Sequence, residues 1–286
     1  MHNKRILLIG SQAYENEYFE TLTFIREYGT VCQVYIEKEE IEYSDIPYIN
    51  DDGQVNVNNE TILFDIIVII EPLYYFSGEG FARLLRYELF APKLWLISYP
   101  DRKIYGRVYD KLKSLYEKGR QIDYEKTFLL GENIKDAIEK HSKYRIIGKE
   151  GTNLLFERIS DKIFIETGTI EDRVSQMPGG EVFFAISNCN GILSSSALGE
   201  DITIRDGIAL LNGEEYFVCE FGMGLNENIK YIKHLAINEK AFGTCHFGFG
   251  NNIAFGGTSD LNYHFDITIF GFELYGVTDG GEVRLI

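Results

Sequence analysis

Cysteine, proline and tryptophan are scarce in this sequence of 286 residues, which contains four Cys, five Pro and one Trp. The four cysteines are far apart and form no CxxC pair; they are Cys32, Cys189, Cys219 and Cys245. This spacing argues against a zinc ribbon and against a scaffold held by disulfides. We therefore expect free thiols.

Basic residues are also few, since 28 Lys and Arg stand against 44 Asp and Glu for a net charge of −16. Such an acidic chain repels phosphate groups, so we expect neither nucleic acid nor a membrane surface as partner. No apolar run approaches the ~20 residues of a membrane span. The opening MHNKRILLIG is too short for a signal peptide, and we expect a cytoplasmic protein. The content of 20 Phe and 19 Tyr supplies material for a globular core.

The first half of the chain alternates strand patterns with helix patterns. Strands are predicted at 4–10, 31–36, 64–70 and 93–98, and helices at 15–28, 79–90 and 105–118. This order is typical of a parallel sheet covered by helices. We predict a small, doubly wound, Rossmann-like α/β domain over residues 1–142, with a polar surface excursion or hairpin at 40–62. The loop after the first strand lacks GxGxxG, so nucleotide binding is not expected.

Beyond about residue 143 helical periodicity fades, and short β-like segments are separated by Gly and Asn. The predicted strands are 144–147, 154–158, 162–166, 182–186, 202–205, 208–211, 216–219 and 267–274. This pattern predicts a β-rich α+β domain over residues 143–286.

Two of the five histidines stand where a metal could bind. His264 and Asp266 are two residues apart in a strand-like segment, so their side chains should project from the same face. His246 would complete a two-His, one-carboxylate set, which leaves positions open for a substrate. Without a metal, the His and Asp could instead hydrogen-bond to each other. The other histidines, His2, His141 and His234, are expected on the solvated surface.

Two glutamates lie among apolar residues. Glu181 precedes Val-Phe-Phe, and Glu220 stands between Cys219 and Phe221. A carboxylate in such surroundings is costly to bury unless it is paired or bound to a metal. Glu181 and Glu220 are therefore further candidate ligands.

A series of short motifs resembles the aminopeptidase T family of metallopeptidases, whose superfamily includes the 2,5-dihydroxypyridine dioxygenases. The motifs cover roughly residues 143–286 and are GTNLLF (151–156), PGGEVFFA (178–185), NG (190–191), CEFGMGLN (219–226), EKAFGTCHFGFGNN (239–252), FGG (255–257), YHFD (263–266) and DG (279–280). The resemblance implies a centre for divalent metal, namely Zn, Co or Mn. It places the five peptidase ligands of a two-metal centre on Glu181, Glu220, His246, His264 and Asp266.

The same resemblance implies a hydrolase that cleaves a peptide N-terminus or a small amide through a metal-activated water. Glu181 or Glu220 would then be the general base. Members of the family commonly form homodimers, and we expect one here. The hydrolase is the leading hypothesis, because Glu181 and Glu220 have no clear purpose in a site with one metal.

One position departs from the peptidase pattern, which has a tyrosine seven residues after the first histidine where this chain has Ile253. The segment GFGNNIAFGG looks more like the dioxygenase branch, in which one Fe(II) is held by residues matching His246, His264 and Asp266. A mononuclear Fe(II) enzyme that cleaves an aromatic ring is therefore the second hypothesis. Because the chain is shorter than typical members, the third is a non-catalytic accessory protein that binds a peptide or another protein.

Overall fold

The computed structural model describes residues 4–38, 54–57, 60–71, 93–100, 102–169, 174–195, 198–232 and 236–286. The described chain forms two compact units. One comprises Met1–Arg120 with Gly168–Pro178, and the other comprises Gln121–Thr167 with Gly179–Ile286. Within the described ranges, no helix is both long and apolar enough to cross a bilayer. The division into separate domains near residue 142 stays a prediction.

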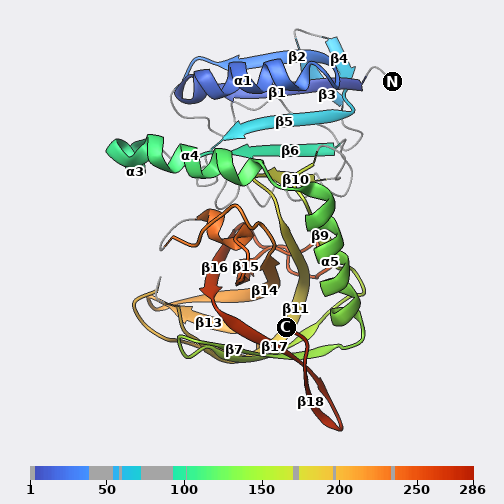
Figure 1. Ribbon diagram of the computed structural model, residues 1–286, viewed down its shortest axis with the longest axis vertical. Coiled ribbons are helices and arrows are strands. Elements are labelled where there is room, and N and C mark those ends of the chain that lie inside the picture. Colours follow the sequence, from blue (N-terminus) through green and yellow to red (C-terminus); the bar gives the residue numbers. More distant parts are fainter. Residues whose placement is uncertain are drawn as a thin grey trace. The chain divides into compact units, whose positions relative to one another are not determined.

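The first unit is built on a five-stranded parallel sheet with the order β10-β6-β5-β1-β2 (Figure 1). The strands are β10 (Val174–Met177), β6 (Lys93–Ser98), β5 (Ile66–Glu71), β1 (Lys4–Ser11) and β2 (Gly29–Ile36). The aliphatic runs of β1 and β5 need cover on both faces, which is typical of parallel sheets. Ile6 and Leu8 belong to one apolar cluster, and Leu7 and Ile9 belong to another. Helix α1 (Glu15–Ile25) packs on β1 and β2.

Most of the elements predicted for this unit are present with shifted ends. The helix predicted at 105–118 is α4 (Tyr109–Arg120), preceded by the short α3 (Arg102–Tyr105) and η4 (Gly106–Val108). The excursion contains a hairpin of β3 (Gln54–Val57) and β4 (Glu60–Leu63). The helix predicted at 79–90 lies outside the described residues, so a doubly wound arrangement stays a prediction. Strand β10 was not predicted, because it joins the sheet from far along the chain.

The second unit is rich in antiparallel strands, as the sequence predicted. Its described residues include one long helix, α5 (Tyr124–Glu139), which begins where the Asp123 side chain accepts a hydrogen bond from the Lys126 backbone nitrogen. The other elements are β7 (Lys143–Gly148), β8 (Asn153–Arg158), β9 (Phe164–Glu166), β11 (Glu181–Leu193), β12 (Ile202–Arg205), β13 (Ile208–Leu211), β14 (Glu214–Gly224), η5 (Ala236–Lys240), β15 (Thr244–Gly250), β16 (His264–Phe270), β17 (Phe272–Thr278) and β18 (Gly281–Arg284).

Two long strands, β11 and β14, each belong to two portions of the strand network. Their residues Glu181–Ala185 and Glu220–Gly224 pair with each other, whereas the rest of β11 pairs with β8 and β12 and the start of β14 pairs with β13. Each strand has a register shift where it changes partners, near Asn188 and Cys219. Such bulges bend a strand and increase its twist. The bends wrap the network around one apolar core that includes Phe156, Phe184, Phe221 and Phe247.

Candidate metal centre

The candidate residues gather on one face of the strands β11, β14, β15 and β16. The register places Glu220 opposite Gly248, and Gly248 opposite Asp266, in one row across three strands. His246 lies opposite Gly222 in the next row. Alternate residues of the same strands, such as Phe221 and Phe247, point into the apolar core. The period of two residues in a strand therefore separates a polar face from the core.

Glycines on the polar face make room for the functional side chains. A Cβ atom at Gly222 would lie 2.3 Å from His246 Nε2, and one at Gly248 would lie 2.9 Å from Asp266 Oδ1. Both distances are too short for a real contact. The imidazole of His246 thus packs directly over the backbone of β14, and Gly248 leaves space between Glu220 and Asp266.

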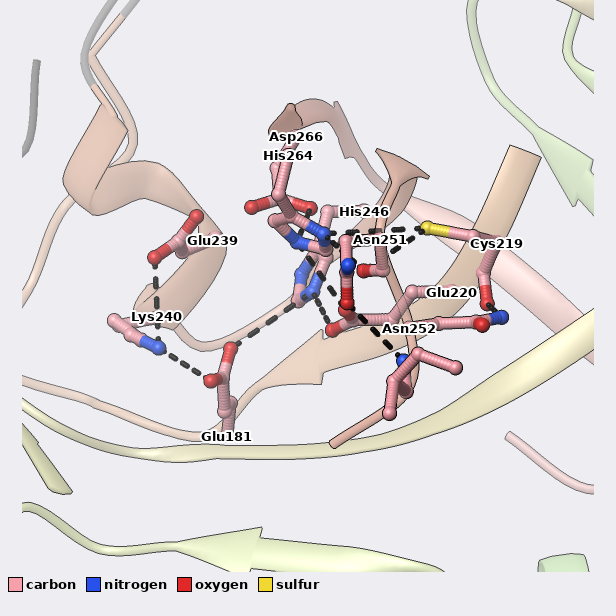
Figure 2. Close-up of polar contacts among 11 residues, drawn as sticks. Glu181, Cys219, Glu220, Glu239, Lys240, His246, Asn251, Asn252, His264 and Asp266 are labelled. Carbon is pink, nitrogen blue, oxygen red and sulfur yellow. Dashed lines mark hydrogen bonds and ion pairs between the residues drawn. The ribbon is translucent and has the colours of Figure 1, made fainter. Parts of the chain in front are cut away.

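The nitrogen and oxygen atoms of the site converge on a small volume (Figure 2). Glu220, His264 and Asp266 offer ligand atoms that all lie within 4.8 Å of one another. His264 Nε2 is 3.4 Å from Glu220 Oε2 and 3.7 Å from Asp266 Oδ1. His246 Nε2 is 3.3 Å from Glu220 Oε1 and 3.8 Å from Glu181 Oε2. The five residues predicted from the sequence are therefore neighbours.

The two histidines differ in how they are held. His264 Nδ1 is 2.8 Å from the carbonyl oxygen of Asn251. A carbonyl can only accept, so Nδ1 carries the hydrogen and Nε2 is left with a lone pair toward the carboxylates. His246 Nδ1 is buried and has no hydrogen-bond partner among the described residues. A hydrogen bond at the nitrogen that does not bind the metal orients a metal-binding imidazole. His264 has such a bond, so its ring is already oriented for a metal ion.

Asn251 and Asn252 fix the loop between β15 and β16, and both are fully buried. The Asn251 side chain donates to the backbone oxygen of Leu261 and accepts from the backbone nitrogen of Ile253. The Asn252 side chain donates to the backbone oxygen of Cys219 on β14. These bonds hold the carbonyl that orients His264. Sequence reasoning noted the Asn-Asn pair only as part of a motif.

Sequence reasoning missed a second group of charges, which surrounds Lys240 of η5. The ammonium of Lys240 contacts Glu181 Oε1 and lies 3.4 Å from Glu166 Oε2 and from Glu239 Oε1. Figure 2 shows Glu181 between Lys240 and His246. Glu181 thus links the lysine to the candidate ligands. The signal in the sequence was the charged pair Glu239-Lys240 next to an apolar segment.

Burial and dense negative charge shift the pKa values of the site. Burial lowers the pKa of His246, but the Glu220 hydrogen bond and the nearby carboxylates outweigh burial and raise this pKa to about 10. Burial, and then the charge of Glu220, raise the pKa of Asp266 to about 7 although His246 opposes the shift. Burial also raises the pKa of Glu239 to about 7 against the effect of Lys240. The negative charge of the buried carboxylates therefore exceeds the positive charge of the groups around them.

Burial would likewise lower the pKa of Lys240. The charges of Glu181, Glu239 and Glu166 outweigh that effect and hold this pKa well above its usual range. The surrounding carboxylates therefore favour the charged form of the Lys240 ammonium inside the protein.

The residues present fit a divalent metal ion. Glu220 Oε2 and Asp266 Oδ1 are buried and have no hydrogen-bond partner within the described part of the chain. Ligands at ~2.1 Å from one ion lie roughly 3 to 4 Å apart, and the distances between His264 Nε2 and these two oxygens fall in that range. Imidazole and carboxylate donors suit Zn, Fe, Mn and Co.

The parallel sheet and the strand-rich second unit define a mixed α/β protein with a possible metal-binding triad of Glu220, His264 and Asp266. No family model matches the sequence, and no curated protein matches it significantly.

The fold is similar to that of several solved structures, among them the following two. The 2,5-dihydroxypyridine dioxygenase from Pseudomonas putida KT2440 has a TM-score of 0.62 and 14% identity, over 99% of this chain and 90% of that chain. AmpT from Thermus thermophilus has a TM-score of 0.64 and 12% identity, over 100% of this chain and 94% of that chain. At such identities the likeness shows a common fold and leaves the reaction open.

Proposed function

We propose that this chain is a metal-dependent hydrolase that holds one divalent ion and acts on a peptide N-terminus or a small amide. His264, Asp266 and Glu220 would hold the ion, with His246 as a further donor within reach. A divalent ion bound there would supply an acidified water and polarise a substrate carbonyl. The observation that carries the proposal is the convergence of these buried donors around two carboxylate oxygens without a hydrogen-bond partner in the described residues.

Glu181 is the candidate general base. Its Oε1 contacts the ammonium of Lys240, whereas its Oε2 faces the ligand group at 3.8 Å from His246 Nε2. Lys240 therefore fixes the orientation of the carboxylate and leaves one oxygen to take up a proton from the attacking water. Glu220 is less suited to this role, because both of its oxygens lie against imidazole nitrogens.

The test is hydrolysis of a panel of amino-acid amides and anilides by protein loaded with Zn, Mn or Co. We expect turnover in at least one case, and Glu181→Gln should lower kcat by about 100-fold or more while the bound metal stays. The matched control is Glu157→Gln, which removes a carboxylate that pairs with Lys143 in the same unit. No turnover with any metal, or full activity of Glu181→Gln, would contradict the proposal.

A second candidate is a mononuclear Fe(II) enzyme that cleaves an aromatic ring. Two features of the sequence favour it: His246, His264 and Asp266 supply the two imidazoles and one carboxylate that such sites use, and Ile253 offers no side-chain donor for an oxyanion. The pairing of Glu181 with Lys240 also gives this glutamate a purpose without a second metal. Oxygen uptake after anaerobic loading with Fe(II), measured with 2,5-dihydroxypyridine, separates this reaction from hydrolysis.

A further inference from the structure

Lys240 gathers three carboxylates beside the candidate metal centre. They come from β9 (Glu166), β11 (Glu181) and η5 (Glu239), so segments far apart in the sequence deliver them to one ammonium. The Lys240 side chain is 4% exposed, and its partners are between 8% and 12% exposed. These contacts form a buried ion cluster around one ammonium group, in contrast to ion pairs on the protein surface.

Three buried carboxylates need a cation. Uncompensated charges are strongly unfavourable inside a protein, and a cage of carboxylate oxygens is the donor set that Mg²⁺, Ca²⁺ and Mn²⁺ prefer. An ammonium on the chain satisfies the same need without being able to dissociate.

Glu181 connects this cage to the metal centre. One of its oxygens contacts Lys240, and the other lies 3.8 Å from His246 Nε2. A second metal ion next to the first would need the Glu181 oxygen that the ammonium already occupies.

We propose that Lys240 is a built-in cation that fills the position of a second metal ion and limits the site to one divalent ion. It is thus a determinant of metal number, an inference that rests on the metal centre of the proposed function and deepens it.

The experiment measures Mn²⁺ per chain, by calorimetric titration and by element analysis after gel filtration, together with the shift in Tm that Mn²⁺ causes. The wild type and Lys240→Arg, which keeps the charge, should each bind one ion. Lys240→Met keeps much of the length but loses the charge, so it should bind two ions and show a larger Tm rise with Mn²⁺. Lys126→Met removes an exposed lysine that pairs with Glu227 and should behave as the wild type.

Two ions on the wild type, or an unchanged ion number and Tm response in Lys240→Met, would overturn the inference. If Lys240→Met does not fold, the double variant Lys240→Met/Glu166→Gln carries one less uncompensated charge and should show the same gain relative to Glu166→Gln alone. No ion on the wild type together with one on Lys240→Met would contradict both the metal centre of the proposed function and the limit of one ion that we assign to Lys240. If the ion numbers are as expected but the protein hydrolyses none of the substrates, the result contradicts only the proposed reaction and leaves the role of Lys240 in place.

Discussion

His264 donates its Nδ1 hydrogen to the backbone oxygen of Asn251 at 2.8 Å, and this bond turns Nε2 toward Glu220 and Asp266. The loop between β15 and β16 thereby sets the direction of an imidazole on the following strand. His246 lacks such a bond within the described residues. Of the two candidate histidines, only His264 therefore has an imidazole that a hydrogen bond among the described residues orients for a metal ion.

Truncation of the Asn251 side chain tests the role of this loop. Asn251→Ala removes the bonds to Leu261 and Ile253 that hold the loop, so the carbonyl that orients His264 should become less well placed. We expect metal affinity to fall by about 10- to 100-fold with the fold retained, as measured by calorimetric titration and circular dichroism. Asn153→Ala, which loses an exposed bond to Arg145, is the control. Unchanged affinity in Asn251→Ala would contradict the role given to the loop.

A methyl group at Gly248 should disturb the centre directly. The Cβ of Gly248→Ala would lie 2.8 Å from Glu220 Cβ and 2.9 Å from Asp266 Oδ1, so both carboxylates must shift. Overpacking of this kind costs about 1 to 3 kcal/mol of stability, and we expect weaker metal binding as well. Gly280→Ala is the matched control, because its nearest neighbour is Thr278 Oγ1 at 3.7 Å. Equal metal affinity and Tm in the two variants would show that Gly248 is not needed for space.

A buried ion network in the first unit predicts a pH dependence of stability. Glu17 is fully buried and accepts from Tyr109 at 3.0 Å, with Arg102 and Lys113 each at 3.1 Å. Burial would raise the pKa of Glu17, but hydrogen bonds and the charge of Lys113 lower it below its ordinary value of 4.5. A lowered pKa in the folded state contributes stability that is fully present above about pH 4.5 and is lost as the pH falls through the folded value.

Glu17→Gln should therefore reduce the free energy of unfolding by about 1 to 3 kcal/mol at pH 7, and this difference should shrink toward pH 3. Urea unfolding followed by the fluorescence of Trp95, which is buried in the same unit, measures it. Glu117→Gln changes a half-exposed partner of Lys113 and should have little effect. If the difference in free energy of unfolding between the wild type and Glu17→Gln grows as the pH falls, the result contradicts the proposed role of this network.

The sequence predicted the strands of both units well where apolar residues dominate. The run Phe-Asp-Ile-Ile-Val-Ile-Ile gave β5, and the His264-x-Asp266 spacing correctly placed both side chains on one face of β16. The segment predicted as one strand at 267–274 is in fact two, because the chain turns at Gly271 with a φ of 71°. A glycine in such a conformation cannot be told from one in a strand by periodicity alone.

The charged surroundings of the candidate ligands could not be predicted in the same way. Glu239 and Lys240 lie in η5, a 3-10 helix of five residues that is too short to show a period. Glu166 reaches the same point from β9, and only the pairing of β9 with β11 brings it there. The pairing of Glu181 with Lys240 could not be predicted either, because the two residues are far apart in the sequence. The role of Glu181 as a metal ligand stays a prediction.

Metal content is the measurement that tests the central claim most directly. Element analysis of protein purified without chelator and then dialysed against Mn²⁺ should give close to one ion per chain for the wild type, and close to none for His264→Ala and Asp266→Ala. His141→Ala, at a position remote from the site in sequence, should retain the wild-type value. A wild type that binds no ion, or His264→Ala and Asp266→Ala proteins that bind as much as the wild type, would contradict the account.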